Sequence, residues 1–298
     1  MEEDISNKKS IGLVSDEMGD LPEEIIKENE ISIVPFKIEY GELENLPGNV
    51  YQKIRTVEQR GMKSLIKTSQ PSINAFLSVY QEKLKHFENV ICVSFSSKVS
   101  GSYNSALQAV KFLPANLQSK VAVIDSLLAT STEGLFILKL IDLIKNTQLK
   151  FSEIIQKITK EIPNYKLLAT YDKPKWIEAS GRLPSFLPMA LNQAELRNIK
   201  PIFGLKGGKL SIVGIRKNIN GLGQTIFEEF EKQTLSIKNS GRKIKIAITH
   251  ADNPEQAEKL ASLIKTRDYL ELIFVNLVCF PVGGHVGPGT LILSWQQE

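Results

Sequence analysis

Short apolar runs rich in β-branched residues alternate with longer amphipathic stretches in the first half of the chain, and this alternation constrains the fold more than any other feature. The predicted order is strand 11–15, helix 21–29, strand 31–38, helix 73–87, strand 90–95, helix 103–113 and strand 121–125. Such alternation favours a largely parallel sheet that is covered by helices.

The second half of the chain continues the mixture of strands and helices. After a helix at 151–162, the predicted elements are strand 166–170, a hairpin at 201–215 with a glycine turn, helix 220–235, strand 243–249, helix 254–265 and strand 270–276. We therefore expect an α/β protein with two α/β domains and mainly parallel sheets. The N-terminal domain is expected over 10–155 and the C-terminal domain over 156–298.

Two helix starts carry capping signals in the sequence. Asp20 and Glu23 have the spacing of a capping box, and Pro22 is acceptable in a first helical turn. Ser152 is the predicted N-cap of the helix at 151–162.

Composition and charge narrow the class of protein. The net charge of +4 is mild and the lysines are scattered with no basic run, which argues against nucleic-acid binding. Cys92 and Cys279 lie in apolar runs, as expected for buried thiols in a reducing compartment. The polar start MEEDISNKKS does not fit a signal peptide, and the most apolar stretch is too short to span a bilayer. We expect a cytoplasmic location.

The familiar catalytic signatures are missing from the sequence. GLKGGKL lacks the spacing of a P-loop, GLGQTI lacks the third glycine of a dinucleotide fingerprint, and no Gly-x-Ser-x-Gly elbow occurs. His86, His250 and His285 are far apart and have no paired cysteines, so a zinc site is not expected. We therefore predict no catalytic residue, no metal and no cofactor.

Three polar stretches follow or border predicted strands: KTSQPS at 67–72, SFSSKVSGSYNSA at 94–106 and PVGGHVGPGT at 281–290. N-capping accounts for hydroxyl residues before a helix, but it explains only one or two of the five serines between 94 and 102. The glycine- and proline-rich stretch predicts an irregular turn around His285, which could equally be an idle residue of a hairpin-like connection.

The position of these stretches suggests a ligand. In doubly wound α/β folds, ligands gather at the carboxyl ends of strands, beside helix N-termini that favour anions. Hydroxyl groups and one imidazole at such a place can hold a single carboxylate by hydrogen bonds, without a lysine or arginine. This indicates a binding site, because no nucleophile, base and orienting acid form a recognisable set.

Seven short motifs, taken together and in order, resemble the DegV family of bacterial proteins. They extend from about residue 11 to residue 296 and read SDEMGDLP, KTSQPS, SSKVSGSYNSA, VIDS, SGRLPS, HADNPEQAE and GGHVGPG. The resemblance implies a two-domain α/β protein that buries one long-chain fatty acid between its domains. It also implies a partner, a separate fatty acid kinase, to which the protein presents the carboxylate for conversion to acyl phosphate.

The same resemblance assigns roles to individual residues. It implies that the fatty acid carboxylate is bound by Thr68 and Ser69, by Ser100 with Gly101, and by His285. In the second domain it implies kinase contacts at Arg182 and Arg216.

Other features of the sequence bear on this resemblance. Apolar candidates for the lining of an acyl tunnel are 134–144 and 184–193, which could equally be ordinary core. Two departures from the family pattern are Gly284, where a threonine usually precedes the histidine, and the divergent segment 43–61. Transient membrane contact for lipid exchange is also expected.

Two other functions stay open on the sequence alone. One is a small-molecule transferase or hydrolase that uses His285 as a base toward a serine, and the other is a regulatory scaffold whose bound lipid is only structural. A His285→Ala variant separates the first from a binding protein, because turnover is lost in one case and bound lipid in the other. Stimulation of a kinase by the lipid-loaded protein is expected of a substrate-presenting protein and is not expected of a scaffold, so this measurement tests the second alternative.

Overall fold

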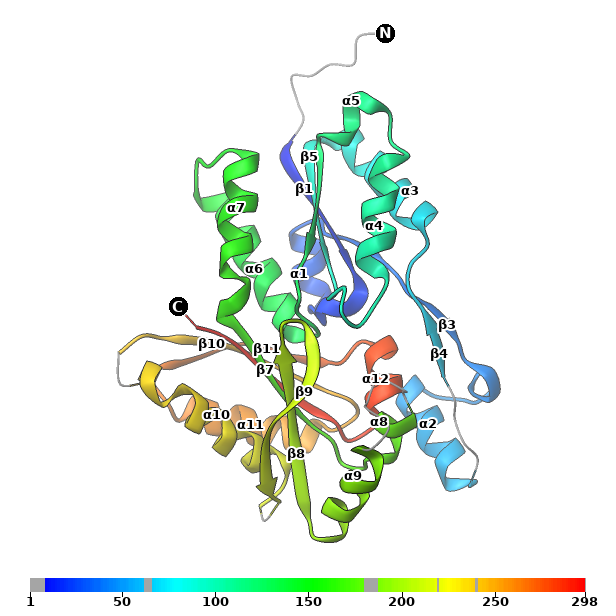
Figure 1. Ribbon diagram of the computed structural model, residues 1–298, viewed down its shortest axis with the longest axis vertical. Helices are drawn as coiled ribbons and strands as arrows, with labels where there is room; N and C mark the ends of the chain where they lie inside the picture. Colours follow the sequence, from blue (N-terminus) through cyan, green and yellow to red (C-terminus); the bar gives the residue numbers. More distant parts are fainter. Residues whose placement is uncertain (1–8, 62–65, 180–186, 219, 239–240, 298) are drawn as a thin grey trace.

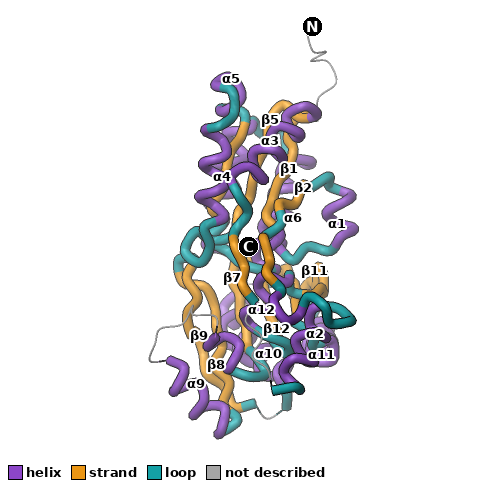
Figure 2. The backbone as a smooth tube through the Cα atoms, turned by 90° about the vertical axis from the view of Figure 1, so that its right-hand side faces the viewer, coloured by secondary structure: helices purple, strands orange, loops and turns teal. Residues whose placement is uncertain are grey.

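Two large β-sheets follow one another along the length of the molecule (Figure 1). A computed structural model describes residues 9–61, 66–179, 187–218, 220–238 and 241–297. The strands of the first sheet come from before residue 126 and those of the second from after residue 164. The side view shows the same elongated arrangement, with the first sheet above the second (Figure 2).

The first sheet is parallel throughout, as the alternation of strands and helices predicts. Its order is β2-β1-β5-β6, formed by Ser32–Val34, Lys9–Asp16, Phe87–Ser94 and Val121–Asp125. Because successive side chains of a strand point to opposite faces, its apolar residues divide between two separate core clusters.

Helices cover both faces of this sheet. Those of the first half are α1 (Glu23–Glu28), α3 (Ile73–His86), α4 (Ser102–Lys111), α5 (Ala115–Gln118), α6 (Ser131–Asn146) and α7 (Phe151–Glu161). Helices α3 and α4 pack on one face, and α6 and α7 on the other (Figure 1). The helices predicted from apolar spacing in this half are confirmed.

The stretch 31–38 is not one strand, contrary to the prediction. Only its first part joins the first sheet, as β2. Its second part, β3 (Lys37–Glu39), pairs antiparallel with β4 (Lys67–Ser69) in a separate two-stranded sheet. Pro35 lies between the two parts and has no N–H to donate to a strand ladder, so the chain leaves the first sheet there.

The second sheet has six strands in the order β11-β10-β12-β7-β8-β9, formed by Leu270–Leu277, Ile244–His250, Leu291–Gln296, Tyr165–Thr170, Ile199–Lys206 and Lys209–Lys217. The mixed α/β class is confirmed. Among the described neighbouring pairs, however, β10–β11 is parallel and the other four are antiparallel, so the expectation of a mainly parallel sheet is wrong here. The reason is connectivity, because β8 and β9 form the predicted hairpin and β12 returns between β10 and β7.

The helices of the second half cover one face of this sheet. Helices α10 (Leu222–Lys238) and α11 (Pro254–Lys265) bury its apolar side chains, whereas its other face turns toward the first half of the chain. Helix α9 (Leu187–Leu196) lies toward the lower end of the molecule in Figure 1, whereas the short helix α8 (Lys175–Ala179) lies beside α12. Helix α2 (Val50–Gln59) comes early in the chain but packs against the second half.

The predicted irregular turn at 281–290 is wrong in its first part, because Phe280–Val286 form helix α12. Pro281 lies in the first turn, where a missing N–H costs nothing. Gly283 allows a close approach, since a Cβ at this position would come within 1.9 Å of Tyr51 Oη. One glycine of this stretch is therefore explained by packing inside a helix and not by a turn.

Both predicted helix caps are also wrong. Helix α1 starts after Pro22, while Asp20 Oδ1 accepts the N–H of Cys279 over 2.7 Å. This carboxylate therefore joins two distant parts of the chain. The N-cap of α7 is Lys150, and Ser152 lies inside the first turn.

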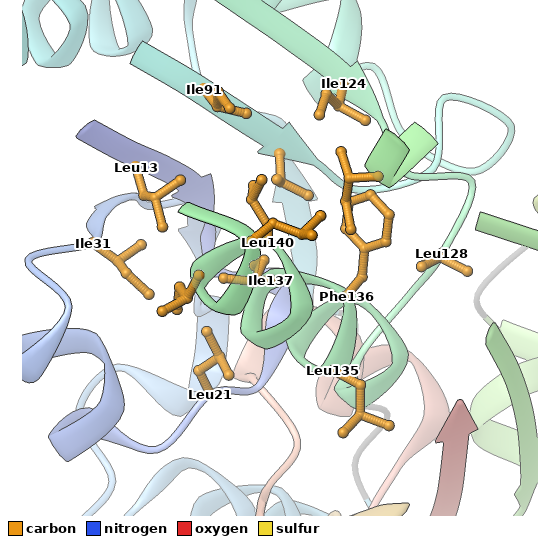
Figure 3. Packing of buried hydrophobic residues seen from close by; sticks show 14 of the residues in the cluster. Leu13, Leu21, Ile31, Ile91, Ile124, Leu128, Leu135, Phe136, Ile137 and Leu140 are labelled. Atoms are coloured by element: carbon orange, nitrogen blue, oxygen red, sulfur yellow. The ribbon is translucent and has the colours of Figure 1, made fainter. Parts of the chain in front are cut away.

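Helix α6 lies between the two sheets and shares one core cluster with both. Figure 3 shows Leu140 and Phe136 of α6 facing Ile91 and Ile124 of the first sheet. Ala247 and Phe274 of the second sheet belong to the same cluster. A helix that is apolar on nearly all sides is stable only when it is buried in this way.

Buried polar groups fix the first turn of α6. Ser131 Oγ lies 3.2 Å from Thr249 Oγ1 and 2.8 Å from Ser294 Oγ, both in the second sheet. Glu133 Oε1 accepts the hydroxyl of Ser15 in the first sheet over 3.3 Å. Because buried polar groups require partners, these contacts set the position of α6 against both sheets.

Replacement of Gly134 tests this close packing. A Cβ at Gly134 would lie 2.4 Å from the carbonyl oxygen of Gly19. We expect Gly134→Ala to lower the free energy of unfolding by about 1–3 kcal/mol, because the added methyl pushes α6 from its neighbour. Urea unfolding measures the change. Asp142→Ala, on the exposed face of the same helix, is the control, and an undiminished stability of Gly134→Ala would contradict the contact.

Candidate functional site

A cavity of about 120 Å³ lies between the two halves of the chain, and we call it the central cavity. Its lining comes from both halves: Met18, Phe36, Thr68, Phe95, Val99, Ser100, Ala129, Thr130, Leu167, Ala169, Leu205, Leu210, Pro281, Val282, His285, Val286 and Ile292. Most of these side chains are apolar and few are polar, which is the usual make-up of a small-molecule site. Three of the predicted site residues, Thr68, Ser100 and His285, are among them.

Thr68 and His285 are in direct contact in this lining. Thr68 Oγ1 on β4 lies 2.8 Å from His285 Nε2 on α12, although the residues are 217 positions apart. One of these two groups donates to the other, so the neutral pair keeps one further hydrogen that it can donate to an anion. The pair can therefore receive a carboxylate inside an otherwise apolar cavity.

The divergent segment 43–61 supports the helix that carries His285. Tyr51 Oη donates to the carbonyl oxygen of Val278, just before α12, over 2.9 Å. Arg55 Nε pairs with Asp252 over 2.5 Å and joins α2 to the second half. This segment therefore positions the imidazole without touching the cavity.

Gly284 has a packing neighbour that accounts for its size. A Cβ at this position would lie 3.0 Å from Ile66 Cδ1. A threonine here would require Ile66 to move, so the glycine and Ile66 fit one another.

Ser100 and Gly101 form the start of α4. Ser100 Oγ accepts the N–H of Ser102 over 3.2 Å, and Gly101 is the N-cap. The side-chain amide of Gln70 lies against Gly101, where a Cβ would come within 2.8 Å of its Nε2. Two of the three predicted polar stretches therefore touch beside the cavity, and Gln70 is a contact that sequence reasoning did not identify.

Asp16 accounts for two of the five serines between 94 and 102. Its Oδ2 accepts the hydroxyls of Ser94 over 3.0 Å and Ser102 over 2.6 Å, and the N–H of Phe95 over 3.0 Å. Burial raises the pKa of Asp16, and the hydrogen bonds act in the opposite direction. Sequence reasoning missed this role, although the acid directly after the first strand was a usable signal.

Another of these serines attaches the β8–β9 hairpin to the first half. Ser96 Oγ donates to the carbonyl oxygen of Gly208, at the tip of the hairpin, over 2.8 Å. Leu205 and Leu210, beside the tip, line the central cavity. The hairpin therefore closes one side of this cavity.

Other predicted site residues lie outside the cavity. Ser69 is exposed at the end of β4 and does not line it. Arg216 on β9 forms an ion pair of 2.7 Å with the buried carboxylate of Glu229 on α10. Arg182 lies outside the described residues.

The two stretches predicted as possible lining of an acyl tunnel lie in different parts of the structure. The stretch 134–144 belongs to the core around α6, and none of its residues lines the central cavity. The stretch 184–193 begins outside the described residues. Its Leu191 packs with Tyr171 and Phe203 in a small cluster.

A second cavity, of about 210 Å³, borders the turn Glu17–Gly19, and we call it the acidic cavity. Its lining is Ser15, Asp16, Glu17, Gly19, Asp20, Leu21, Ile26, Ile33, Ile137, Asn276, Leu277, Val278 and Cys279. Burial raises the pKa of Asp20 to about 7 and that of Glu133, in α6 nearby, well above its ordinary value. This cavity was not predicted from the sequence.

The chemistry available at the central cavity is recognition of an amphiphile by hydrogen-bond donors and apolar walls. Across the described ranges, no three His, Cys, Asp or Glu side chains are arranged to hold a metal ion. The helices within those ranges include none that is both long and apolar enough to cross a membrane.

Comparisons with known proteins give a consistent result. The family model described as "Uncharacterised protein, DegV family" matches residues 10–298. A DegV domain-containing protein of Staphylococcus aureus is 27% identical over 286 residues, which cover 94% of this chain and 96% of the relative. The fold matches the structure of a fatty-acid-binding DegV family protein from Thermus thermophilus with a TM-score of 0.82 and 20% identity. The match covers 97% of this chain and 100% of that one. The structure of a stearic acid-binding protein from Eubacterium ventriosum matches with a TM-score of 0.81 and 20% identity, and the match covers 96% of this chain and 98% of that one.

The raised pKa of Asp20 predicts a pH dependence of stability. The folded state keeps the proton up to about pH 7, and the unfolded state releases it near pH 3.8. Stability should therefore fall as the pH rises from about 4 to 7, by up to about 4 kcal/mol from this group.

Urea unfolding of the wild type and Asp20→Asn, in a buffer free of amines, checks this dependence. The variant should gain stability relative to the wild type as the pH rises, because its amide has no charge to bury. Glu24→Gln, exposed on α1, should follow the wild type. A constant difference between wild type and Asp20→Asn from pH 4 to 8 would contradict the expectation.

Proposed function

The chain belongs to the DegV family, and on that premise we propose that it binds one long-chain fatty acid in the central cavity. We further propose that it presents the carboxylate to a separate kinase, which forms the acyl phosphate. The observation that carries the proposal is the Thr68–His285 pair, because it places a hydroxyl group and an imidazole side by side in an apolar cavity between the two halves.

The headgroup site would combine residues from three segments. Thr68 and His285 contact one another, and Ser100 lines the same cavity with Gly101 beside it. Ser69 lies at the adjoining strand end. Hydrogen bonds without a formal positive charge suit a group that changes from carboxylate to acyl phosphate and remains bound.

The apolar walls support the acyl part of the proposal. A long acyl chain has a dozen or more methylenes, and burial of each is worth about 0.8 kcal/mol, or roughly 10 kcal/mol before ordering costs. The central cavity is smaller than the 300 Å³ or more that is typical of ligand pockets. The β8–β9 hairpin, joined to the first half through Ser96 and Gly208, is the wall that can move to widen it.

Relatives support the same assignment. The Thermus thermophilus and Eubacterium ventriosum proteins, which share the fold, bind a fatty acid and stearic acid respectively. The kinase, a cytoplasmic location and transient membrane contact during lipid exchange rest on the resemblance of the motifs. The unpaired Cys92 and Cys279 agree with a reducing compartment.

Two alternatives make different demands on the same residues. A transferase or hydrolase would need His285 to take a proton from a serine, yet the hydroxyl group that its Nε2 contacts is that of Thr68. A scaffold with structural lipid would bind the fatty acid but leave every kinase unaffected.

Native mass spectrometry of the purified protein, followed by extraction and identification of the lipid, tests the binding. We expect one C14–C18 fatty acid per chain. Thr68→Val, Ser100→Ala and His285→Ala should each lower the affinity about 10- to 100-fold, because each removes a hydrogen bond to a charged group. Ser78→Ala, exposed on α3, is the matched control. A stable wild type that neither contains nor takes up fatty acid would refute the proposal.

Ala169 should limit the length of the acyl chain. It lies on β7 beside Leu167 and Ile292, and all three line the central cavity. We expect Ala169→Phe to shift the bound fatty acids to chains several carbons shorter, because the ring fills part of the space. Mass spectrometry of extracted lipid measures the shift. Ala115→Phe, exposed on α5, should keep the wild-type chain length.

The proposed kinase contact at Arg216 requires a paired variant. Arg216→Ala alone leaves the buried carboxylate of Glu229 unpaired and should lower the stability by about 3–5 kcal/mol. Arg216→Met combined with Glu229→Gln removes both charges and should remain folded. If Arg216 contacts the kinase, this double variant should bind fatty acid normally and lower acyl phosphate formation at least tenfold. Unchanged phosphorylation would exclude the contact.

A further inference from the structure

The outer half of the β8–β9 hairpin, residues 204–211, borders the central cavity, and we call it the lid segment. We propose that the lid segment is a hinged lid, and that a fatty acid enters and leaves the central cavity when this lid opens. The inference rests on the proposed function, since it assigns an entrance to the same cavity.

The base of the hairpin is attached to the second half of the chain. Thr170 Oγ1 on β7 donates to the carbonyl oxygen of Pro201 on β8 over 3.2 Å. On the other strand of the hairpin, Arg216 pairs with the buried carboxylate of Glu229 on α10 over 2.7 Å. Both strands are therefore fixed at their base, so any opening of the hairpin has to begin further along it.

A β-bulge separates this base from the lid segment. The register of β8 with β9 shifts between Ile202 and Phe203, which leaves Val213 on β9 without an opposite residue. A bulge disrupts the ladder locally and bends the strand. At the same level, the recorded pairing of β7 with β8 consists of Ala169 and Phe203. The lid segment thus extends beyond its pairing with the sheet, and the bulge is the place at which it can bend.

The inner side of the lid segment faces the central cavity. Leu205 and Leu210 lie opposite one another in the hairpin, and both line the cavity. Leu167 and Ala169 on β7 line it as well. The closed cavity, of about 120 Å³, is smaller than is typical of ligand pockets. A movement of the two leucines away from β7 would widen it and give a long acyl chain a way in.

A hydrogen bond from the first half of the chain holds the tip of the lid segment. Ser96 Oγ, which is buried, donates to the carbonyl oxygen of Gly208 over 2.8 Å. Leu127 Cδ2 and Lys98 Cγ lie beside the same glycine. Gly207, the other residue of the turn, is exposed and would have no heavy atom within 4 Å of a Cβ. The tip is therefore held from one side, and Ser96 stabilises the closed position.

A reversible crosslink between the tip and the first half tests the lid. A Cβ at Gly208 would lie 2.5 Å from Ser96 Oγ, so Ser96→Cys combined with Gly208→Cys is within reach of a disulfide bond. The reduced variant is loaded with hexadecanoic acid, oxidised, and mixed with an excess of perdeuterated hexadecanoic acid. Native mass spectrometry then follows the replacement of the bound lipid. We expect the crosslinked protein to exchange at least tenfold more slowly than the same protein after reduction.

The opposite change removes the hydrogen bond at the tip. Ser96→Ala should exchange bound hexadecanoic acid about three- to tenfold faster than the wild type, because the closed position loses one hydrogen bond while the cavity lining stays intact. Ser78→Ala, exposed on α3, should exchange at the wild-type rate. Ser96→Cys alone, treated with the same oxidant, controls for effects on Cys92 and Cys279.

Two results would overturn the inference. One is an unchanged exchange rate in protein that mass spectrometry shows to be crosslinked, and the other is a wild-type rate in Ser96→Ala. The second decides the question even if the disulfide bond does not form.

Amide hydrogen exchange over residues 204–211 separates the lid from the proposed function, because it requires no lipid. Faster amide exchange in Ser96→Ala, in a protein that takes up no fatty acid, would refute only the fatty acid proposal. Fatty acid binding with a rate that neither variant alters would refute only the lid.

Discussion

The first turn of α6 is the constraint on which the rest of the structure depends. Its hydroxyl and carboxylate groups bond to opposite sheets, through Ser131 on one side and Glu133 on the other. Thr130, the residue before it, has φ 54° and ψ −144° and lines the central cavity. A β-branched residue keeps so costly a conformation only where its neighbours determine it from both sides. The cavity wall and the joint between the sheets are therefore one structural unit.

Buried polar groups then arrange the loops around this unit. Asp16 collects two serine hydroxyls and thereby fixes the start of α4 beside Ser100. Asp20 accepts the N–H of Cys279, the N-cap of α12, which is the helix of His285. Asp16 at the end of β1 and Asp20 shortly after it thus orient the two polar ends of the cavity. Burial of the two carboxylates costs free energy, because their charged forms lose contact with water, and this cost appears as their raised pKa values.

Continuous apolar runs predicted β1 and β5, which are buried on both faces, and apolar spacing predicted α3, which is buried on one face. These patterns failed where long-range contacts decide the backbone. The stretch 281–290 contains glycines typical of turns, yet Gly283 lies in a helix. This residue is a glycine because Tyr51 occupies the space of a side chain. The mostly antiparallel pairing of the second sheet depends on how β12 returns, which no local pattern encodes. The partners of Asp16 and Asp20 are likewise distant in sequence, so only the fold brings them together.

The turn Glu17–Gly19 has a consequence for regulation. Met18 faces the central cavity, whereas Glu17 and Gly19 face the acidic cavity, so three consecutive residues form a common wall. Cys279 Sγ lies 3.5 Å from Met18 Sδ, which ties this wall to the start of α12. Because the three residues are consecutive, Met18 cannot shift far without a change in the backbone that lines the acidic cavity. The contents of one cavity would thus influence the shape of another that they never touch.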